Sequence, residues 1–389
     1  MRIIVLGTRG FPHVQGGVEV HCQNLYSQLV KLGCEIIVFT RKTYVDVSIK
    51  EYKGVKLVAL PSIRHKSLEA FLHTFTGILA ALRYAQDILH IHGIGPSLFT
   101  PLARILGIKV VITSHGSNYK HLKWGKFAKL ILRFGELLGI FYANEVIAIS
   151  ENIADEIKKK YNRDVTVIPN GVTVQKILQT EDALKKYHLE KGKYLLAVGR
   201  FVPEKGFHDL IDAYCRLPLS RSEERKTKDE NWEKEEEWKL VIVGRADHED
   251  KYSSDLKIMA GRNSNIVLTG FLTGEPLQEL YSHAGLFVLP SYYEGLPIAL
   301  LEALSYGLSC IASDIPSNRN MVSTTRLFEA GNVKALAGAI RKFKGKPLSK
   351  EERNAQRRMV TERYDWGKIA DRTIEVYNQN LAPNRNKTL

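Results

Sequence analysis

Short apolar runs rich in β-forming residues alternate with helical patterns along almost the whole chain of 389 residues. The first run, residues 3–6, ends at Gly7 and leads through a glycine-containing loop into a helical pattern over 18–32. That pattern stops at Gly33, before a second apolar run at 35–40. A strand, a loop, a helix and a strand in this order indicate a parallel sheet with helical crossovers. The sequence therefore predicts an α/β fold.

The alternation of strands and helices forms two consecutive series. Further strand candidates of the first series lie at 56–60, 88–92, 109–114, 145–149 and 165–168. Those of the second series, which begins after Gly171, lie at 194–198, 239–243, 266–269, 286–289 and 309–312. Two such series predict two Rossmann-like domains, at 1–172 and 173–365, which agrees with roughly two to three average domains for this length. A tail helix within about 366–389 is expected to pack back on the first domain.

The formal net charge of +14 is concentrated in the first half, where residues 1–180 contain 23 Lys and Arg against 12 Asp and Glu. Such an excess favours an anionic partner: a nucleic acid, an anionic membrane surface or a phosphorylated substrate. An ordinary solvated basic surface is the alternative. Between Pro218 and Trp238 the chain is almost entirely charged, with both signs, which predicts a solvent-exposed insertion.

The cysteines and the apolar runs bear on location. The four cysteines are too far apart in sequence for a metal knuckle or a redox pair, which indicates a reducing compartment. The N-terminal apolar stretch is too short for a signal peptide. The longest uncharged apolar run, 70–82, has 13 residues, too few to span a bilayer of about 30 Å, and is expected to be a buried helix. We therefore expect a cytoplasmic protein, with any membrane contact peripheral on the inner face of the plasma membrane.

The stretch 291–307 carries the strongest chemical signal. It follows an apolar strand, and Pro297 stands where a helix would begin, because its missing N–H and fixed φ suit the first turn. Glu294 then lies in the loop before the helix, and Glu302 lies just over one turn inside it. Glu302 is flanked by apolar residues on both sides, so its carboxylate needs a partner. A capping role for Glu294 and a solvated position for Glu302 are the alternatives.

The loop into this helix suits an oxygen-rich ligand. Gly295 allows the backbone to approach a ligand closely. The amides of Leu296 and Ile298 would point out of the helix start, where the dipole favours anions or hydroxyl oxygens.

Two glutamates separated by seven residues, with Gly-Leu-Pro between them and a glycine after them, resemble the signature of retaining GT-B glycosyltransferases, and more narrowly of family 4. Further stretches resemble that family in the same order along the chain. They are Gly7 to Glu19 with Gly16-Gly17, Thr113 to Gly116, Ile168 to Val172, and Val198 to Gly206. Five such stretches in order are highly specific, although the glycine loop alone is a weak signal.

The resemblance implies two Rossmann-like domains whose parallel sheets face an interdomain cleft, and it implies roles for named residues. Arg200 and Lys205, with Gly199 and with the amides of Gly16 and Gly17, would hold the donor diphosphate. Glu302 would bind the ribose. The donor sugar would be held by Glu294, Gly295 and the amides of Leu296 and Ile298, with His115 near the reacting centre. The catalytic candidates are therefore His115, Glu294, Arg200 and Lys205, and neither a cofactor nor a metal is expected.

Three other motifs have less specific interpretations. His90 and His92 lie on one face of a strand, but no Asp or Cys accompanies them, so a structural or cleft-lining role is favoured over a metal pair. The acids of 247–250 lack the pattern of metal-dependent transferases. In the segment 120–134, cations and aromatic residues occupy neighbouring helical faces. This suits an anionic membrane surface or a lipid-pyrophosphate acceptor, and equally an ordinary solvated basic face.

We therefore expect a retaining glycosyltransferase that uses a UDP- or GDP-sugar and a glycan or lipid-linked acceptor, with cell-surface polysaccharide synthesis as the family's habit. A GT-B epimerase or phosphorylase is the nearest alternative. A dinucleotide dehydrogenase is disfavoured, because the loop 7–10 lacks the spaced third glycine and no acid clearly ends the second strand. A non-enzymatic basic protein that binds nucleic acid would need stacking platforms or a groove-reading helix, and charge alone is poor support for one.

Overall fold

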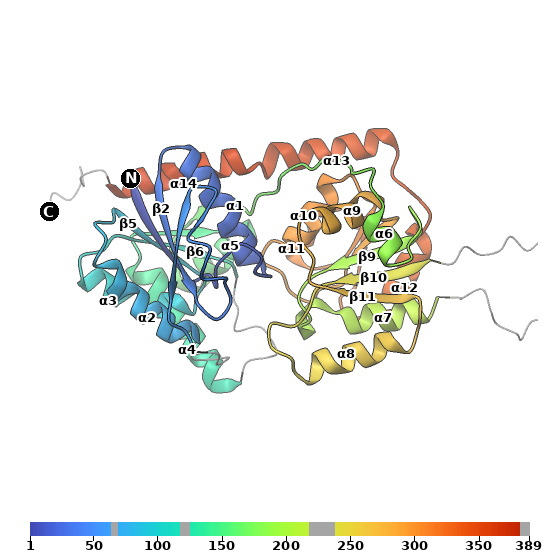
Figure 1. Cartoon of the computed structure of the whole chain (residues 1–389), viewed down its shortest axis with the longest axis horizontal. Helices are drawn as coiled ribbons and strands as arrows, with labels where there is room; N and C mark the ends of the chain where they lie inside the picture. The colour runs from blue at the N-terminus through green and yellow to red at the C-terminus, as the bar shows by residue number, and fades with distance from the viewer. Residues whose placement is uncertain (64–68, 117–124, 218–237, 382–389) are drawn as a thin grey trace, which may run out of the picture. The chain divides into compact units, whose positions relative to one another are not determined.

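The computed structural model describes residues 1–63, 69–116, 125–217 and 238–381. The charged insertion, and Lys120 and Lys123 of the basic segment, lie outside these residues. The chain separates into two compact units, one formed by Met1–Gly171 with Tyr364–Leu389 and the other by Val172–Arg363. Figure 1 shows a sheet surrounded by helices in each unit.

The first unit contains an eight-stranded sheet in the order β3-β4-β2-β1-β5-β6-β7-β8. All neighbouring strands are parallel except β3 and β4, which form an antiparallel edge. The strands are β1 (Arg2–Leu6), β2 (Glu35–Arg41), β3 (Glu51–Tyr52), β4 (Val55–Leu60), β5 (Ile88–His92), β6 (Val110–Ser114), β7 (Glu145–Ala148) and β8 (Thr166–Val167). The helices are α1 (Gly17–Lys31), α2 (Glu69–Ala81), the 3₁₀ turn η1 (Pro96–Phe99), α3 (Thr100–Ile105), α4 (Lys126–Tyr142), α5 (Glu151–Tyr161) and α14 (Trp366–Leu381).

The second unit contains a six-stranded, fully parallel sheet in the order β11-β10-β9-β12-β13-β14. The strands are β9 (Tyr194–Val198), β10 (Lys239–Val243), β11 (Ile266–Gly270), β12 (Leu286–Leu289), β13 (Cys310–Ser313) and β14 (Leu327–Phe328). The helical segments are α6 (Asp182–Lys186), η3 (Pro203–Lys205), α7 (Phe207–Cys215), α8 (Lys251–Gly261), α9 (Glu275–His283), α10 (Ile298–Ser305), α11 (Pro316–Arg319), η4 (Thr324–Arg326), α12 (Val333–Phe343) and α13 (Lys350–Arg363). The predicted strands of both series are confirmed, whereas β3 and β14 were not expected.

Each sheet has the doubly wound strand order, in which the first strand lies between the second and the fourth. The first strand is β1 in one unit and β9 in the other, and the fourth is β12 in the second unit and, leaving out the antiparallel β3, β5 in the first. Ligands of such sheets bind at the carboxyl ends of the strands on either side of this switch point. The loops after β1, β5, β9 and β12 are therefore the places where a site is expected.

The last helix of the chain completes the core of the first unit. Helix α14 packs against α1, as Figure 1 shows. Its side chains Trp366, Ile369 and Tyr377 are buried in the same cluster as Ile3 and Leu25. The indole of Trp366 also lies against the backbone of Gly171, where the first stretch of this unit ends, since a Cβ built at Gly171 would be 2.4 Å from the ring. The first unit thus includes residues from both ends of the chain.

The apolar run at 70–82 forms helix α2, but the expectation that this helix is fully buried is wrong. Its buried positions include Glu69, His73 and Thr74, whereas large apolar side chains of the same helix are exposed. The exposed ones are Phe71, Leu72, Phe75 and Leu79. In the described parts of the chain, no helix has both the length and the apolar character that a membrane crossing requires.

The position of Trp366 generates a stability prediction. Trp366→Ala is expected to destabilise the first unit by about 3–5 kcal/mol, because it removes a large buried ring and leaves a cavity beside Gly171. Native-state hydrogen exchange should show faster exchange of the β1 and β2 amides and unchanged exchange of the β9 amides. Glu375→Ala, on the exposed face of the same helix, should change little. Equal acceleration in both sheets would contradict this assignment of α14 to one unit.

Candidate functional site

The loop after β9 is held against the loop after β12 by a backbone contact. Gly206 has φ +65°, and a Cβ at this residue would lie 2.2 Å from the carbonyl oxygen of Pro290. Only glycine combines this φ with so close an approach. The contact places η3, which ends at Lys205, beside the segment that begins at Ser291.

Lys205 and Glu294, predicted to act on different parts of a donor, are paired directly. Lys205 Nζ donates to Glu294 Oε1 at 2.6 Å, and the Ser291 hydroxyl donates to the same oxygen at 2.6 Å. The lysine and glutamate side chains are 19% and 11% exposed, so the pair is largely shielded from solvent. The sequence reading assigned no role to Ser291, whose buried hydroxyl helps to orient the carboxylate.

Arg200, in the loop after β9, is also paired with a carboxylate. Its Nη1 lies 2.9 Å from Asp247 Oδ2, in the loop after β10. The two loops are joined by the Phe201 amide, which donates to the Arg245 carbonyl at 3.0 Å. The sequence reading gave Asp247 no partner, because an acid in a loop carries no local signal of the cation it meets. Gly199 lies between β9 and Arg200, with the stem of Lys205 within 3.4 Å of the position a Cβ would take.

Helix α10 begins at Ile298, directly after Pro297, as the sequence predicts. The first amides of a helix have no partner within it, so they are directed at whatever lies before its start. Gly295 and Ile298 are partly exposed, whereas Leu296 is buried.

Glu302 lies one turn into α10, and its carboxyl group has a raised pKa. Burial raises its pKa to about 7. The hydroxyl of Tyr281 donates to Oε2 at 3.0 Å, and this hydrogen bond opposes the rise because it favours the charged form. The ring of Tyr281 stacks on that of Tyr306 with a centroid distance of 5.3 Å. A carboxyl group with this pKa changes charge near neutral pH. Further hydrogen-bond donors that approach it would stabilise its charged form.

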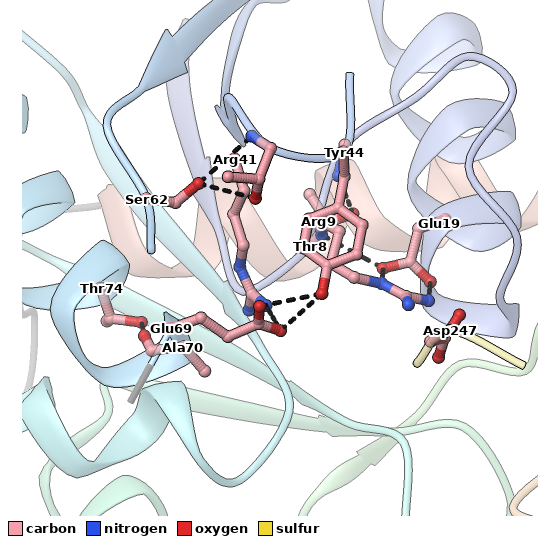
Figure 2. Close-up of polar contacts among 12 residues, drawn as sticks. Thr8, Arg9, Glu19, Arg41, Tyr44, Ser62, Glu69, Ala70, Thr74 and Asp247 are labelled. Carbon is pink, nitrogen blue, oxygen red and sulfur yellow. Dashed lines mark hydrogen bonds and ion pairs between the residues drawn. The ribbon is translucent and has the colours of Figure 1, made fainter. Parts of the chain in front are cut away.

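In the first unit, the glycine loop after β1 is shaped by an ion pair, which Figure 2 shows. Arg9 Nε and its backbone amide both donate to Glu19 Oε1 at 3.1 Å, and Arg9 Nη2 donates to the Gln15 carbonyl at 2.5 Å. A Cβ at Gly16 would lie 2.1 Å from Glu19 Oε2, so the pair requires glycine there. A Cβ at Gly17 would meet no atom within 4 Å. The second glycine is therefore not required by packing.

A second buried ion pair lies at the ends of β2 and α2. Arg41 Nη1 donates to Glu69 Oε1 at 2.9 Å, and the Tyr44 hydroxyl donates to Glu69 Oε2 at 2.8 Å (Figure 2). The guanidinium of Arg9 lies 5.4 Å from the centroid of the Tyr44 ring, so the two ion pairs are neighbours. Sequence reasoning missed this cluster, because its members come from three separate segments.

His115, the predicted histidine after β6, is partly exposed and lies in a group of imidazoles whose other members are buried. His92 Nδ1 and His115 Nε2 are 3.0 Å apart, and the ring of His21, from α1, lies 5.0 Å from that of His115. One nitrogen from each of these three rings lies within 4.8 Å of the other two, which makes them the group that could hold a metal ion among the described residues. His90 is stacked on His92 instead of joining the group.

These histidines are neutral, and a network of hydroxyl groups holds two of them. Burial lowers the pKa of His21 to about 4 and that of His90 to about 3, and it lowers the pKa values of His92 and His115 well below the usual range. The Tyr26 hydroxyl lies 2.5 Å from His92 Nε2 and 3.0 Å from His90 Nδ1. His90 is further bonded to Tyr377 of α14, at 2.6 Å, and to Thr113, at 2.7 Å. His115 is therefore positioned by partners that extend to the C-terminal helix.

Two family models match the chain in adjoining stretches. Residues 179–380 match the model of "Glycosyl transferases group 1", and residues 15–176 match that of "Glycosyltransferase Family 4". The first match covers more than half of the chain and contains Arg200, Lys205, Glu294 and Glu302. The second contains His115.

Relatives and solved structures agree with these matches. An uncharacterized glycosyltransferase of Methanocaldococcus jannaschii is 26% identical over 97% of this chain and 98% of its own length. The GDP-mannose:cellobiosyl-diphosphopolyprenol alpha-mannosyltransferase of Xanthomonas oryzae pv. oryzae is 29% identical over 78% of this chain and 77% of its own. Among solved structures, HepE of Anabaena in complex with UDP and glucose superposes with a TM-score of 0.76 at 17% identity, over 97% of this chain and all of that one. That last likeness establishes the GT-B fold.

Both sheets are doubly wound. Arg200, Lys205 and Glu294 in one unit and Arg9 and His92 in the other lie at the carboxyl ends of the two central strands of their sheet, where the strand order reverses. Together with the match over 179–380, these features show that the chain is an enzyme of the group 1 glycosyl transferases, a glycosyltransferase with the GT-B fold.

Proposed function

We propose that this enzyme transfers a sugar from a UDP- or GDP-linked donor to a glycan or lipid-linked acceptor, with retention of configuration, in cell-surface polysaccharide synthesis. The observation that carries the proposal is the placement of two cations, Arg200 and Lys205, in the loop after β9. A nucleotide bound to HepE and a polyprenol-linked acceptor in the name of the Xanthomonas relative support the donor and acceptor classes.

Arg200 and Lys205 are proposed to bind the donor diphosphate. The leaving nucleoside diphosphate gains negative charge in the transition state, and fixed cations stabilise it most at that point. Both side chains are already oriented by carboxylates, so little reorganisation is needed when a phosphate approaches. Gly199 and the amides of Gly16 and Gly17 would supply further hydrogen bonds to phosphate oxygens.

The residues after β12 are proposed to bind the rest of the donor. Glu294, Gly295 and the amides at Leu296 and Ile298 would hold sugar hydroxyls at the start of α10. Glu302 would accept two hydrogen bonds from the ribose, which favour its charged form. His115, being neutral, would act near the reacting centre as a hydrogen-bonding group and not as a cation. No carboxylate is assigned as nucleophile, so we propose same-face attack in which the leaving phosphate takes the acceptor proton.

The diphosphate assignment predicts the effect of removing either cation. Arg200→Ala and Lys205→Ala should each lower turnover by roughly 10²–10³-fold, the scale of losing one preorganised donor to a developing charge. Initial rates with saturating UDP- or GDP-sugar measure this. Lys257→Ala removes an exposed lysine that also pairs with a carboxylate, in the same unit, and should leave turnover unchanged. Losses below tenfold in both variants, with the fold intact, would refute the assignment.

The raised pKa of Glu302 predicts opposite effects on binding and on stability. The folded-state pKa of about 7 lies above the ordinary carboxyl value, so the cost of burying the charge is absent at pH 4 and complete above pH 7. Glu302→Gln should therefore raise the melting temperature at pH 8 and not at pH 4. It should also weaken nucleoside-diphosphate binding at pH 8 by about tenfold or more, because charge-assisted hydrogen bonds are lost.

Calorimetry across pH separates this reading from a structural role for Glu302. Wild-type affinity for the nucleoside diphosphate should fall as the pH drops below about 7, because Glu302 must then lose a proton to accept the ribose hydroxyls. The Glu302→Gln variant should lack this dependence. Asp255→Asn, an exposed change in the same unit, serves as the control. Equal affinities of the wild type and Glu302→Gln at pH 8 would exclude ribose binding by Glu302.

The first unit carries a surface that suits an anionic membrane, and we propose that the enzyme binds peripherally there. Helix α4 exposes Phe127, Phe134 and Phe141, with exposed fractions of 77%, 56% and 56%. Lys126 and Lys129 lie on the same helix. Helix α2, with its own exposed apolar side chains, and α4 both pack against η1. Apolar side chains flanked by cations favour the boundary between headgroups and acyl chains of anionic lipids.

Reversing the charge on α4 tests this surface. Each cation near an anionic membrane contributes about 1 kcal/mol, so Lys126→Glu with Lys129→Glu should abolish sedimentation with phosphatidylglycerol vesicles. Soluble-donor affinity should not change. The matched pair Lys185→Glu with Lys186→Glu makes the same change in net charge on α6 and should still sediment at low salt. Wild-type protein that stays in the supernatant at low salt would contradict the proposal.

A further inference from the structure

Three imidazoles of the first unit, those of His21 and His92 buried and that of His115 partly exposed, converge from separate elements. His21 comes from α1, His92 ends β5 and His115 follows β6. Their ring centroids are 5.4 Å apart for His21 and His92, 5.0 Å for His21 and His115, and 5.3 Å for His92 and His115. One nitrogen of each ring lies within 4.8 Å of the other two. Three rings this close, without a neighbouring carboxylate in the group, are unusual for charged histidines and suit neutral ones.

The partner of His21 fixes which of its nitrogens faces the group. His21 Nδ1 lies 2.9 Å from Asn170 Oδ1, which only accepts hydrogen bonds. The ring proton of neutral His21 is therefore on Nδ1, and Nε2 carries a lone pair. Nε2 is buried and has no hydrogen-bond partner among the residues that the structure describes. An unpartnered buried acceptor calls for a ligand.

His92 can present a second lone pair to the same point. Its Nε2 lies 2.5 Å from the Tyr26 hydroxyl, whose oxygen can accept the ring proton. With the proton on Nε2, Nδ1 faces His115 Nε2 at 3.0 Å. With the proton of His115 on Nδ1, the lone pairs of His21 Nε2, His92 Nδ1 and His115 Nε2 all face the space between the three rings. Without a cation, a proton has to lie between His92 and His115 to make that contact a hydrogen bond.

We propose that His21 Nε2, His92 Nδ1 and His115 Nε2 bind a divalent transition-metal cation of the Zn²⁺ class. Imidazole nitrogens suit such ions, and three histidines with an open fourth position are an established zinc arrangement. Zn–N bonds of about 2.0–2.1 Å place tetrahedral ligand nitrogens about 3.3 Å apart. The His92–His115 separation is already close to this value, so a rotation of the His21 ring would complete the set. The partly exposed ring of His115 provides the entry path.

The supporting hydrogen bonds match those of metal-bound histidines. Such rings usually donate their second N–H to an oxygen acceptor, which fixes the ring and raises its basicity. Asn170 and Tyr26 stand in these positions for His21 and His92. The three proposed ligands, all from described residues, are imidazole nitrogens, so Mg²⁺ and Ca²⁺, which prefer oxygen, are not the expected occupants. This inference shares His115 with the proposed transfer reaction, but it concerns cation binding, which is measured without donor or acceptor.

Titration of the full-length chain, without an affinity tag, with CoCl₂ and ZnCl₂ tests the proposal. One Co²⁺ per chain should bind with the visible absorption of a four-coordinate ion, and Zn²⁺ should displace it. His21→Ala should weaken binding at least a hundredfold, and Asn170→Ala by about 10- to 100-fold. His188→Ala removes an exposed histidine of the other unit and should leave binding unchanged.

The wild-type titration alone can refute the site, whatever the variants do. Absence of Co²⁺ binding by the folded wild type would overturn the proposal, as would binding that His21→Ala and His115→Ala both retain. His115→Ala serves as the second ligand variant because its ring lies at the partly exposed edge, and circular dichroism confirms that each variant is folded. Loss of binding in both ligand variants, with His188→Ala unaffected, would support it.

Discussion

The doubly wound strand order determines where the loops that carry Arg200, Lys205 and Glu294 lie. Strands are added in one direction from β9 to β11 and in the opposite direction from β12 to β14. Because parallel crossovers are right-handed, the helices that follow β9 and β12 pack on opposite faces of the sheet. The loops after these two strands therefore turn to opposite faces of the sheet. The crevice that forms between them at the carboxyl edge exposes their polar groups to a ligand. Arg200, Lys205 and Glu294 all come from these two loops, and in the first unit β1 and β5 carry Arg9 and His92 in the same way.

The uncovered polar groups neutralise one another. Lys205 is held by Glu294, and Arg200 by Asp247. In a partly shielded loop, removing one member of such a pair leaves the other charge uncompensated. A single substitution at Lys205 therefore also changes Glu294, so the measured loss belongs to the pair. Only a double-mutant cycle can separate the diphosphate contact of the lysine from the sugar contact of the glutamate.

Much of this arrangement could be predicted from the sequence, since the strands are continuous apolar runs and the loops carry glycine or proline at fixed places. The stretch from Ser291 to Gly307 also revealed its helix and its two acids, because the signals are local. The partners were not predictable. Asp247 is paired with Arg200, which lies 47 residues earlier in the sequence. His21 has the pattern of any residue of an amphipathic helix, and only the packing of α1 on the sheet brings it to the other histidines. The exposed face of α2 was misjudged because an apolar run does not reveal which of its sides a neighbour covers.

The histidine group depends on the chain end in a way that bears on folding. His90, stacked on His92, is bonded to Tyr377, which is 287 positions away, and Tyr26 joins both histidines. These groups are buried, so each unmade hydrogen bond would cost the desolvation of a polar group. The second unit is continuous in sequence, whereas His90 of the first unit gains its contact with Tyr377 only when α14 has docked. The surroundings of His115 are therefore completed by the last helix of the chain.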